Sequence, residues 1–295
     1  MHTPGRLFAF LFSQKARQLF EKYIIHLAIA GYLIHIAYLT LFGLLKGSTP
    51  PEIFHNVLLA LYTPFSLILI FEVYLLVFYL PRSTTEYVAK EYEIIALIMI
   101  RRMFHDLGQI SLTSQWFTDR HDLTFTVDLL ATLLVFFLIW LFYTVLRAIR
   151  KYARQPSEAK QAQIEHFILT KRRVASLLLI VFATMLIYSI GEAIYLSLIK
   201  GEPFTVKYLS AIFFEDFFTV LIVSDVFLLL YSHYHTHDFH RVMRNSGYII
   251  STVLIRLSFS AEGIVSSLLI VFAVAFSLVI SWIYLQYEKQ GFSQP

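Results

Sequence analysis

The sequence predicts an all-α membrane protein, a polytopic helical bundle with eight transmembrane helices arranged as two parallel four-helix repeats. Two observations predict this fold class. Hydrophobic residues make up 58% of the chain and charged residues 15%, with a mean hydropathy of +0.66, and a soluble protein of that composition would expose large apolar patches. The chain also repeats itself at a near-constant offset, which indicates that one structural unit occurs twice.

The internal repeat is clearest in an apolar segment that contains one acid. Residues 65–80 (FSLILIFEVYLLVFYL) align with residues 218–233 (FTVLIVSDVFLLLYSH), which places Glu72 over Asp225 at an offset of 153. Two further pairs of segments keep offsets of 154 and 155: Lys46-Gly47 with Lys200-Gly201, and 94–101 with 249–256. Agreement across three separated segments favours a tandem duplication.

The predicted spans follow from apolar length. A helix needs about 20 residues to cross a hydrocarbon core of about 30 Å. Six runs meet this requirement: 23–45, 55–81, 124–148, 174–199, 207–232 and 262–286. Two weaker runs, 86–104 and 242–260, contain arginines but occupy the same place in each half, so we count them as spans as well.

The orientation is predicted from the basic residues of alternate loops. With the N-terminus inside, the cytoplasmic segments hold 17 of the 24 Lys and Arg residues, as the positive-inside rule requires. Both termini are therefore expected in the cytoplasm. Because each half has an even number of spans, the two repeats are expected to be parallel.

Two segments outside the spans are predicted to lie at the membrane surface. The expected division is an amphipathic interfacial helix, a first repeat, a basic cytoplasmic linker helix, a second repeat and a cytoplasmic tail: 1–22, 23–148, 149–173, 174–286 and 287–295. A cleaved signal peptide does not fit the N-terminal segment, because its apolar core is short and no cleavage site of small residues follows. The basic segments are expected to contact anionic lipid headgroups, although a solvated linker stays open as an alternative.

The charged residues inside the spans are the candidate functional positions, because an ionisable group in the membrane needs a partner or a water-filled cavity. Counting along the helices places Glu72 and Asp225 roughly 10–14 Å from the cytoplasmic edge. The same count places Arg101 and Arg256 roughly 24 Å from it. Pairing of acid and arginine within each half is therefore disfavoured by a mismatch of about 10 Å.

By depth in the membrane, two other acids are better placed to pair with these arginines. Glu192 lies at about the depth of Arg256, and Asp128 is placed to meet Arg101. These charges serve either as internal ion pairs or as anchors at the interface.

The equivalent acids Glu72 and Asp225 are left without an assigned basic partner. A carboxyl group in that position either takes up a proton or binds a cation. Together with Glu215 and Glu192, the two acids are candidates for a proton or cation pathway. The alternative is that they are neutral and donate hydrogen bonds to backbone carbonyls.

Histidines are concentrated between the sixth and seventh spans. On a helix, His233, His237 and His240 would share one face, which is compatible with a divalent metal site or a pH sensor. Interfacial packing with the nearby aromatic residues is the simpler reading. The chain has no cysteine, so disulfides and thiolate metal sites are excluded.

No feature of the sequence predicts an enzyme or a cofactor. His26 and His35 share a span and no other span offers an interior histidine to oppose them, which disfavours a bis-histidine haem. Motifs for phosphate binding, zinc proteolysis and serine nucleophiles are missing from the sequence. We expect the lipid bilayer as the main partner, other membrane subunits or a second copy as further partners, and no nucleic acid.

Each half resembles the PsiE family of small bacterial membrane proteins with four helices. The matching features are an acid in an aromatic second span (Phe71-Glu72 and Asp225-Val226-Phe227) and a third span that ends in isoleucine and arginine (Arg101 and Arg256). Glu215 also matches the family pattern, whereas the first half departs from it with Tyr62. The resemblance implies a bacterial inner-membrane location and a four-helix unit, and it implies no mechanism.

Two functions of different class follow as hypotheses. The first is a structural, regulatory or accessory subunit of a membrane assembly, with its charges paired internally. The second is a channel-like or transporter-like unit in which Glu72 and Asp225 handle protons or cations. An arginine-paired interior favours the first hypothesis, and water-accessible carboxylates favour the second.

Overall fold

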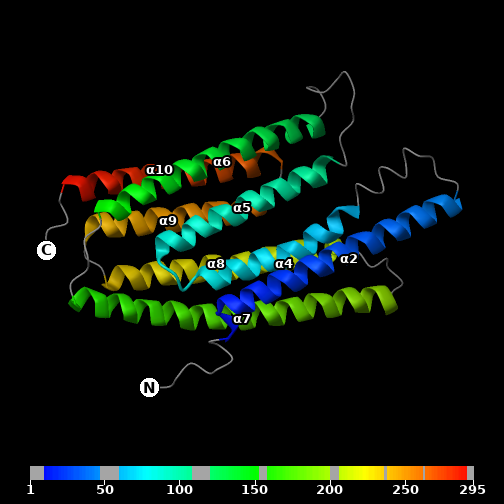
Figure 1. Ribbon diagram of the computed structural model, residues 1–295, viewed down its shortest axis with the longest axis horizontal. Coiled ribbons are helices and arrows are strands. Elements are labelled where there is room, and N and C mark those ends of the chain that lie inside the picture. Colours follow the sequence, from blue (N-terminus) through cyan, green and yellow to red (C-terminus); the bar gives the residue numbers. More distant parts are fainter. Residues whose placement is uncertain are drawn as a thin grey trace.

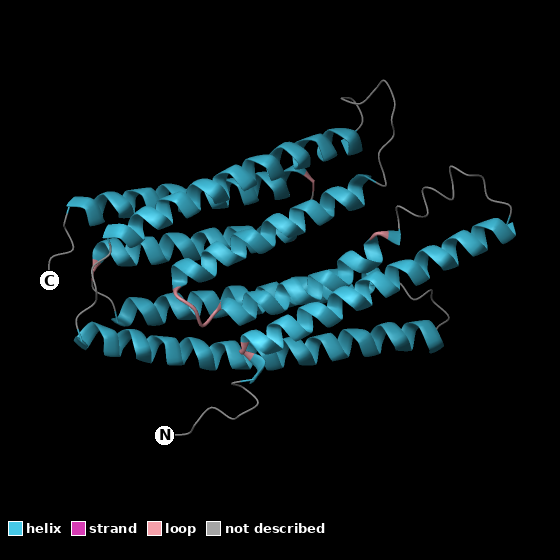
Figure 2. Ribbon diagram, in the orientation of Figure 1, coloured by secondary structure: helices cyan, strands magenta, loops and turns pink. Residues whose placement is uncertain are grey.

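A computed structural model describes residues 10–46, 60–107, 120–152, 158–199, 206–235, 238–261 and 263–290. These residues form long α-helices that lie along an elongated bundle (Figure 2). The helices are α2 (Gln14–Lys46), α4 (Tyr62–Tyr79), α5 (Thr84–Leu107), α6 (Arg120–Tyr152), α7 (Glu158–Ile199), α8 (Val206–His235), α9 (Phe239–Phe259) and α10 (Ile264–Gln290).

Consecutive helices run in alternating directions along the bundle (Figure 1). Helices α2, α4, α5 and α6 pack in sequence, and so do α7, α8, α9 and α10. The two sets meet where α4 contacts α7 and α8, where α5 contacts α9, and where α6 contacts α10. Contacts between α5 and α9 therefore bring residues from the two halves of the sequence into the interior.

Turn chemistry explains two of the reversals. Pro81 follows α4, and α5 begins after Ser83, whose Oγ accepts the backbone N–H of Glu86 at 3.2 Å as a helix cap. Between α9 and α10, Gly263 adopts a φ of 58°, a conformation that is favourable for glycine and unfavourable for other residues. Both turns are short and hold antiparallel helices together.

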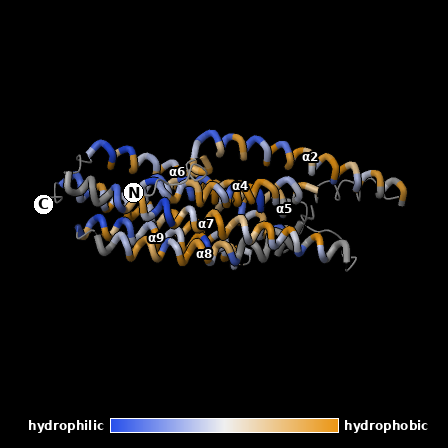
Figure 3. The backbone as a smooth tube through the Cα atoms, turned by 90° about the horizontal axis from the view of Figure 1, so that it is seen from below, coloured by the Kyte–Doolittle hydropathy of each residue, from blue (hydrophilic) through white to orange (hydrophobic). Residues whose placement is uncertain are grey.

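Four of the described helices are long and apolar enough to cross a membrane, and their apolar parts are Gln14–Leu41, Asp122–Tyr152, Glu165–Glu192 and Ile264–Gln290. Large apolar side chains on α2 and α7 are exposed, among them Ile34 and Tyr188, as expected for surfaces that face lipid. The chain is an integral membrane protein with helices that span the bilayer. Figure 3 shows hydrophobic residues along the helices and hydrophilic segments concentrated toward one end. Its residues include Arg150 and Lys151 at the end of α6 and Arg241 and Arg244 at the start of α9, so we call it the basic end; α5, α7 and α9 begin there.

The helix boundaries differ from the predicted division in two places. Residues 14–22, expected in a separate interfacial helix, are the first turns of α2. Residues 158–173, expected in a separate linker helix, are the first turns of α7. The reason is that neither α2 nor α7 contains a proline, so their backbone hydrogen bonds continue without a break into the apolar segment.

Small residues allow the helices of the second half to approach closely. Helix α10 presents Ser266, Ser267, Ala273, Ser277 and Ser281 as buried positions. On α9, a Cβ atom added to Gly247 would lie 2.9 Å from the side chain of Ile280. Small residues at such positions are typical of helix contacts in membranes, and here they set the spacing between α9 and α10.

Candidate functional site

The most deeply buried charge cluster is centred on Arg256 of α9. Its Nη1 atom lies 2.6 Å from Oδ2 of Asp225 on α8, and its Nη2 atom lies 3.2 Å from Oε1 of Glu91 on α5. Arg256 Nη2 also donates a hydrogen bond of 2.7 Å to the hydroxyl group of Tyr87. We call Arg256, Asp225, Glu91 and Tyr87 the Arg256 cluster.

The Arg256 cluster joins the two halves of the chain. Tyr87 and Glu91 lie one turn apart on α5, in the first half, and point at an arginine of the second half. Thr252 of α9 adds a hydrogen bond of 3.2 Å from its Oγ1 atom to Asp225 Oδ2. Since all these side chains are buried, the cluster fixes how α5, α8 and α9 pack together.

The hydrogen bonding of the Arg256 cluster is incomplete. Both carboxylate oxygens of Glu91, Oδ1 of Asp225, and Nε and Nη1 of Arg256 are buried and form no hydrogen bond of favourable geometry with a described residue, although Nη1 and Nη2 of Arg256 lie within ion-pair distance of the two acids. A buried polar atom without a hydrogen bond usually costs about 1–3 kcal/mol. Two carboxylates therefore share one guanidinium group without filling their hydrogen-bonding capacity.

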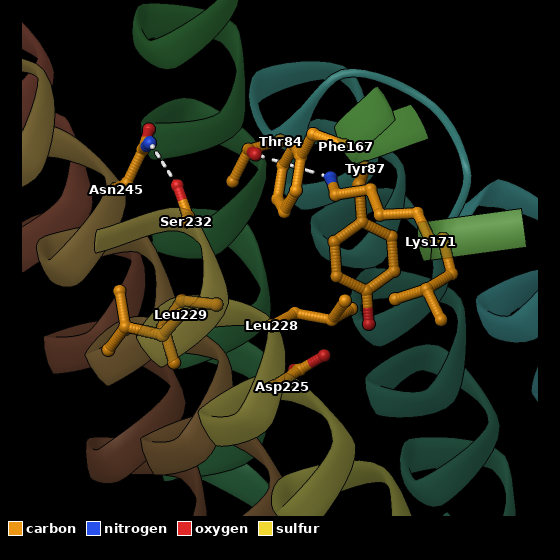
Figure 4. Close-up of a pocket in the computed structure, with 11 residues that line it drawn as sticks. Thr84, Tyr87, Phe167, Lys171, Asp225, Leu228, Leu229, Ser232 and Asn245 are labelled. Atoms are coloured by element: carbon orange, nitrogen blue, oxygen red, sulfur yellow. Dashed lines mark hydrogen bonds between the residues drawn. The ribbon is translucent and has the colours of Figure 1, made fainter. Parts of the chain in front are cut away.

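A small cavity lies beside this cluster, and Figure 4 shows residues that line it. Its volume is about 20 Å³, and its lining includes Tyr87, Asp225, Thr84 and Lys171, so it is large enough for about one water molecule. The Lys171 ammonium group is buried, and it donates hydrogen bonds to the carbonyl oxygen of Arg82 at 3.1 Å and to Thr84 Oγ1 at 3.2 Å. Lys171 therefore joins α7 to the start of α5 beside this cavity.

A second pair joins the corresponding helices of the first half. Arg101 Nη1 on α5 lies 3.2 Å from Glu72 Oε2 on α4, and it also donates a hydrogen bond of 3.0 Å to the carbonyl oxygen of Phe65. The Arg101 side chain is 15% exposed, compared with 1% for Arg256. Glu72 and Asp225 thus each pair with the arginine of their own half.

The predicted mismatch in depth between these acids and arginines is wrong. Side chains on a helix lean toward its N-terminus. Because α4 and α5 run in opposite directions, Arg101 leans toward the basic end and Glu72 leans away from it. The same argument applies to Arg256 and Asp225. Counting backbone rise alone therefore overestimates the separation of the charged groups.

Asp128 pairs with Arg102 instead of the predicted Arg101. Arg102 Nε lies 3.9 Å from Asp128 Oδ2, and Arg102 Nη1 donates a hydrogen bond of 2.7 Å to Ser266 Oγ. Asp128 also accepts a hydrogen bond from Ser267 Oγ. Successive residues of a helix point about 100° apart, so Arg101 faces α4 while Arg102 faces α6 and α10.

The remaining predicted site residues are not brought together. Glu192 is exposed on α7, so its predicted pairing with the buried Arg256 is wrong. The side chains of Glu215 and His233, and the whole of His237, lie outside the described residues. His240 is described, and its ring stacks on Tyr284 and Tyr287 at 5.8 and 6.2 Å between centroids. No group of three metal-binding side chains occurs among the residues that the structure describes.

Further polar contacts connect the halves through the interior. The hydroxyl groups of Tyr92 on α5 and Ser251 on α9 lie 2.7 Å apart, and Ser251 Oγ donates to the carbonyl oxygen of Ala273 at 2.7 Å. Phe142 lies between Tyr92 and Tyr248, with ring centroids 5.1 and 5.9 Å away. These buried groups fill the interior with paired hydroxyls and aromatic rings.

Sequence reasoning missed Glu91, Tyr87 and Lys171. A signal was present for the first two, because Tyr87, Glu91, Ile95 and Ile98 follow one another at helical spacing and share the buried face of α5. Lys171 stands at the start of an apolar run, where a basic residue normally indicates the membrane surface. Its burial is a property of the tertiary structure.

Comparisons with known proteins add no assignment: no protein-family model matches the chain, and no curated protein or solved structure matches it.

Proposed function

We propose that the protein is a structural, regulatory or accessory subunit of a larger membrane assembly and that it conducts no ions. The observation that carries this proposal is the pairing of the interior arginines. Arg101, Arg102 and Arg256 each have a carboxylate within 4.0 Å. A charge that is paired inside a bundle holds helices together, whereas a conduction path needs groups that water reaches.

The pairs have a clear structural role in this proposal. Removing one member of a buried ion pair usually costs about 3–5 kcal/mol, although replacing the whole pair by apolar residues is often neutral. Ion pairs of this type therefore select one arrangement of helices over others. Here the ion pairs connect α4 with α5, α8 with α9, and α5 with both α6 and α9. A hydrogen bond from Arg102 to Ser266 adds α10.

The same proposal includes eight spans in two parallel repeats, with the basic end in the cytoplasm. It is supported by the Glu72-Arg101 and Asp225-Arg256 pairs, which join the second and third helices of each half. It is also supported by Arg17, which lies 154 residues before Lys171, the offset found for Lys46-Gly47. Duplicated four-helix units would account for these correspondences.

We further propose that each half is a PsiE-like unit of a bacterial inner membrane. The acid and the arginine that carry the resemblance are in contact in both halves, which gives the shared pattern a physical reason. No catalytic activity forms part of the proposal.

A proton or cation conductor is the second candidate, and one observation favours it. Glu91 and Asp225 share a single arginine, and three of their four carboxylate oxygens accept no hydrogen bond from a described residue. A proton or a small cation bound there would satisfy these oxygens. The small cavity at Lys171 would then be the entry from the basic end.

Flux measurements distinguish the two candidates. The purified protein is reconstituted into liposomes that contain a pH-sensitive dye, and a potassium gradient with valinomycin drives proton movement. An accessory subunit gives the flux of empty liposomes. The proposal would be overturned in favour of a conductor if the wild-type protein passes protons and this flux is lost in a variant. The variants to test are Glu91→Gln and the double variant Glu72→Gln with Asp225→Asn. Purification in a mild detergent gives the positive test, because a subunit should elute with companion proteins.

A further inference from the structure

A large groove lies between the first turns of α2 and the middle of α7. Its volume is about 920 Å³, near the upper limit of ordinary ligand pockets. Both helices pack against α4, whose Tyr74 lines the groove, and they diverge along the bundle (Figure 1). Tyr74 also donates a hydrogen bond of 2.9 Å to the carbonyl oxygen of Leu11, which holds the short segment before α2 at this site.

The walls of the groove are apolar over most of their length. Aliphatic and aromatic side chains of α2 and α7 line it, including Leu19, Tyr23 and Ile180, which are all exposed. Because they belong to two apolar helices of an integral membrane protein, the groove opens toward lipid and not toward water. Its occupant must therefore be largely hydrocarbon.

Two arginines give the groove a charged end. Arg172 and Arg173 line it and are exposed, and neither forms an ion pair with a described residue. Their neighbour Lys171 is buried and turns to the interior instead. The two guanidinium groups therefore remain available to an anion beside the uncharged run of α7 that begins at Val174.

The groove is long enough to hold an acyl chain of one leaflet. From Arg172 to Leu186, the last residue of α7 in the lining, the groove extends about 21 Å at 1.5 Å per residue. Half of the hydrocarbon core is about 15 Å. An acyl chain that starts at the arginines therefore fits along the groove without crossing into the opposite leaflet.

We infer that this groove binds an anionic diacyl phospholipid, with the phosphate group at Arg172 and Arg173 and the acyl chains between α2 and α7. Arginine pairs bind phosphate through several directed hydrogen bonds, and basic pockets between membrane helices are typical sites for anionic headgroups. The inference concerns only the membrane-facing surface and does not depend on whether the interior conducts ions.

The test measures which lipids the full-length protein retains. Protein in detergent is incubated with an equal mixture of phosphatidylglycerol and phosphatidylcholine, passed through a size-exclusion column, and analysed by mass spectrometry of the bound lipid. Wild-type protein should prefer phosphatidylglycerol on the order of tenfold, because each arginine near the headgroup contributes to anion binding. Arg172→Gln with Arg173→Gln should remove the preference.

Two matched controls make the result specific. Arg147→Gln with Arg150→Gln removes two exposed arginines of α6 at the same end of the bundle, and this variant should keep the preference. Ala183→Trp fills the groove and should reduce lipid retention, whereas Thr184→Trp, at an exposed neighbouring position outside the lining, should not. Equal retention of both lipids, an equal loss in the α6 variant, or unchanged retention in Ala183→Trp would each overturn the inference.

Discussion

Arg256 Nη1 lies 2.6 Å from Asp225 Oδ2, and both side chains are 1% exposed. This pair connects α8 with α9, and Glu91 extends it to α5 of the first half. An arginine so deeply buried is stable only because neighbouring carboxylates compensate its charge. The stability of the whole bundle should therefore respond to changes at Arg256 more than at any exposed arginine.

Replacing Arg256 by methionine should destabilise the protein by about 3–5 kcal/mol, because two buried carboxylates lose their counter-charge. Arg101→Met should cost less, since Arg101 compensates the single carboxylate of Glu72, whereas Arg256 compensates both Asp225 and Glu91. Thermal unfolding in detergent, followed by size-exclusion fluorescence, measures both variants. Arg147→Met, at an exposed position of α6, is the control. Equal midpoints for Arg256→Met and Arg147→Met would contradict the role of the cluster.

The two acids of the Arg256 cluster should contribute differently to the stability of the protein. Asp225 has the closer contact with Arg256 and accepts a hydrogen bond from Thr252, whereas both oxygens of Glu91 lack hydrogen bonds from described residues. Asp225→Asn should therefore destabilise the protein clearly. Glu91→Gln should change stability by no more than about 1 kcal/mol, because removing an unsatisfied buried charge offsets the lost attraction.

The same unfolding assay measures this difference. A larger loss for Glu91→Gln than for Asp225→Asn would mean that Glu91 is the main counter-charge of Arg256. The double variant Glu91→Gln with Asp225→Asn serves as the reference, because the uncompensated arginine it leaves should make it the least stable of the three.

The helix positions were largely predictable from the sequence, because long apolar runs must form helices in a bilayer. Glu72, Asp225, Arg101 and Arg256 also stood out as costly charges in apolar surroundings. Their pairing could not be read from the chain, since depth along a helix locates Cα atoms and leaves out the lean of long side chains. The four residues were therefore identified correctly, and only the distances between their charged groups were predicted wrongly.

The part of the site that could not be predicted depends on contacts between the halves. Glu91 meets Arg256 only because α5 packs on α9, and the rotation of one helix against another is not encoded in local periodicity. Lys171 shows the same limit, because it looked like a surface residue and is buried against the loop before α5. Neither contact can be predicted without knowing how the helices pack in the tertiary structure.

Gly247 should tolerate no side chain. A Cβ atom there would lie 2.9 Å from Ile280 of α10, and such overpacking typically costs about 1–3 kcal/mol. Gly247→Ala should therefore lower the unfolding midpoint, and Ile280→Ala in the same protein should restore part of the loss. Gly191→Ala is the matched control, because nothing lies within 4 Å of its Cβ position, and it should be neutral or slightly stabilising. Equal unfolding midpoints for Gly247→Ala and Gly191→Ala would show that α9 and α10 are not packed closely at Gly247.

Cysteine accessibility should show whether α9 crosses the bilayer, and the chain is suited to this test because it contains no cysteine. Phe239 at the start of α9 and Ser260 just after its end are both exposed. If the basic end is cytoplasmic, Ser260→Cys should react with a membrane-impermeant maleimide in intact cells, and Phe239→Cys should react only after permeabilisation.

The result bears directly on the proposed repeat. Helix α9 contains Arg256 and is not among the four long apolar spans, so its crossing rests on the compensation of that arginine by Asp225 and Glu91. Labelling of both cysteines in intact cells would mean that α9 does not cross, and the proposal of eight spans would then fail. Labelling on opposite sides, lost on replacing both acids by their amides, would show that the Arg256 cluster is what allows α9 to enter the bilayer.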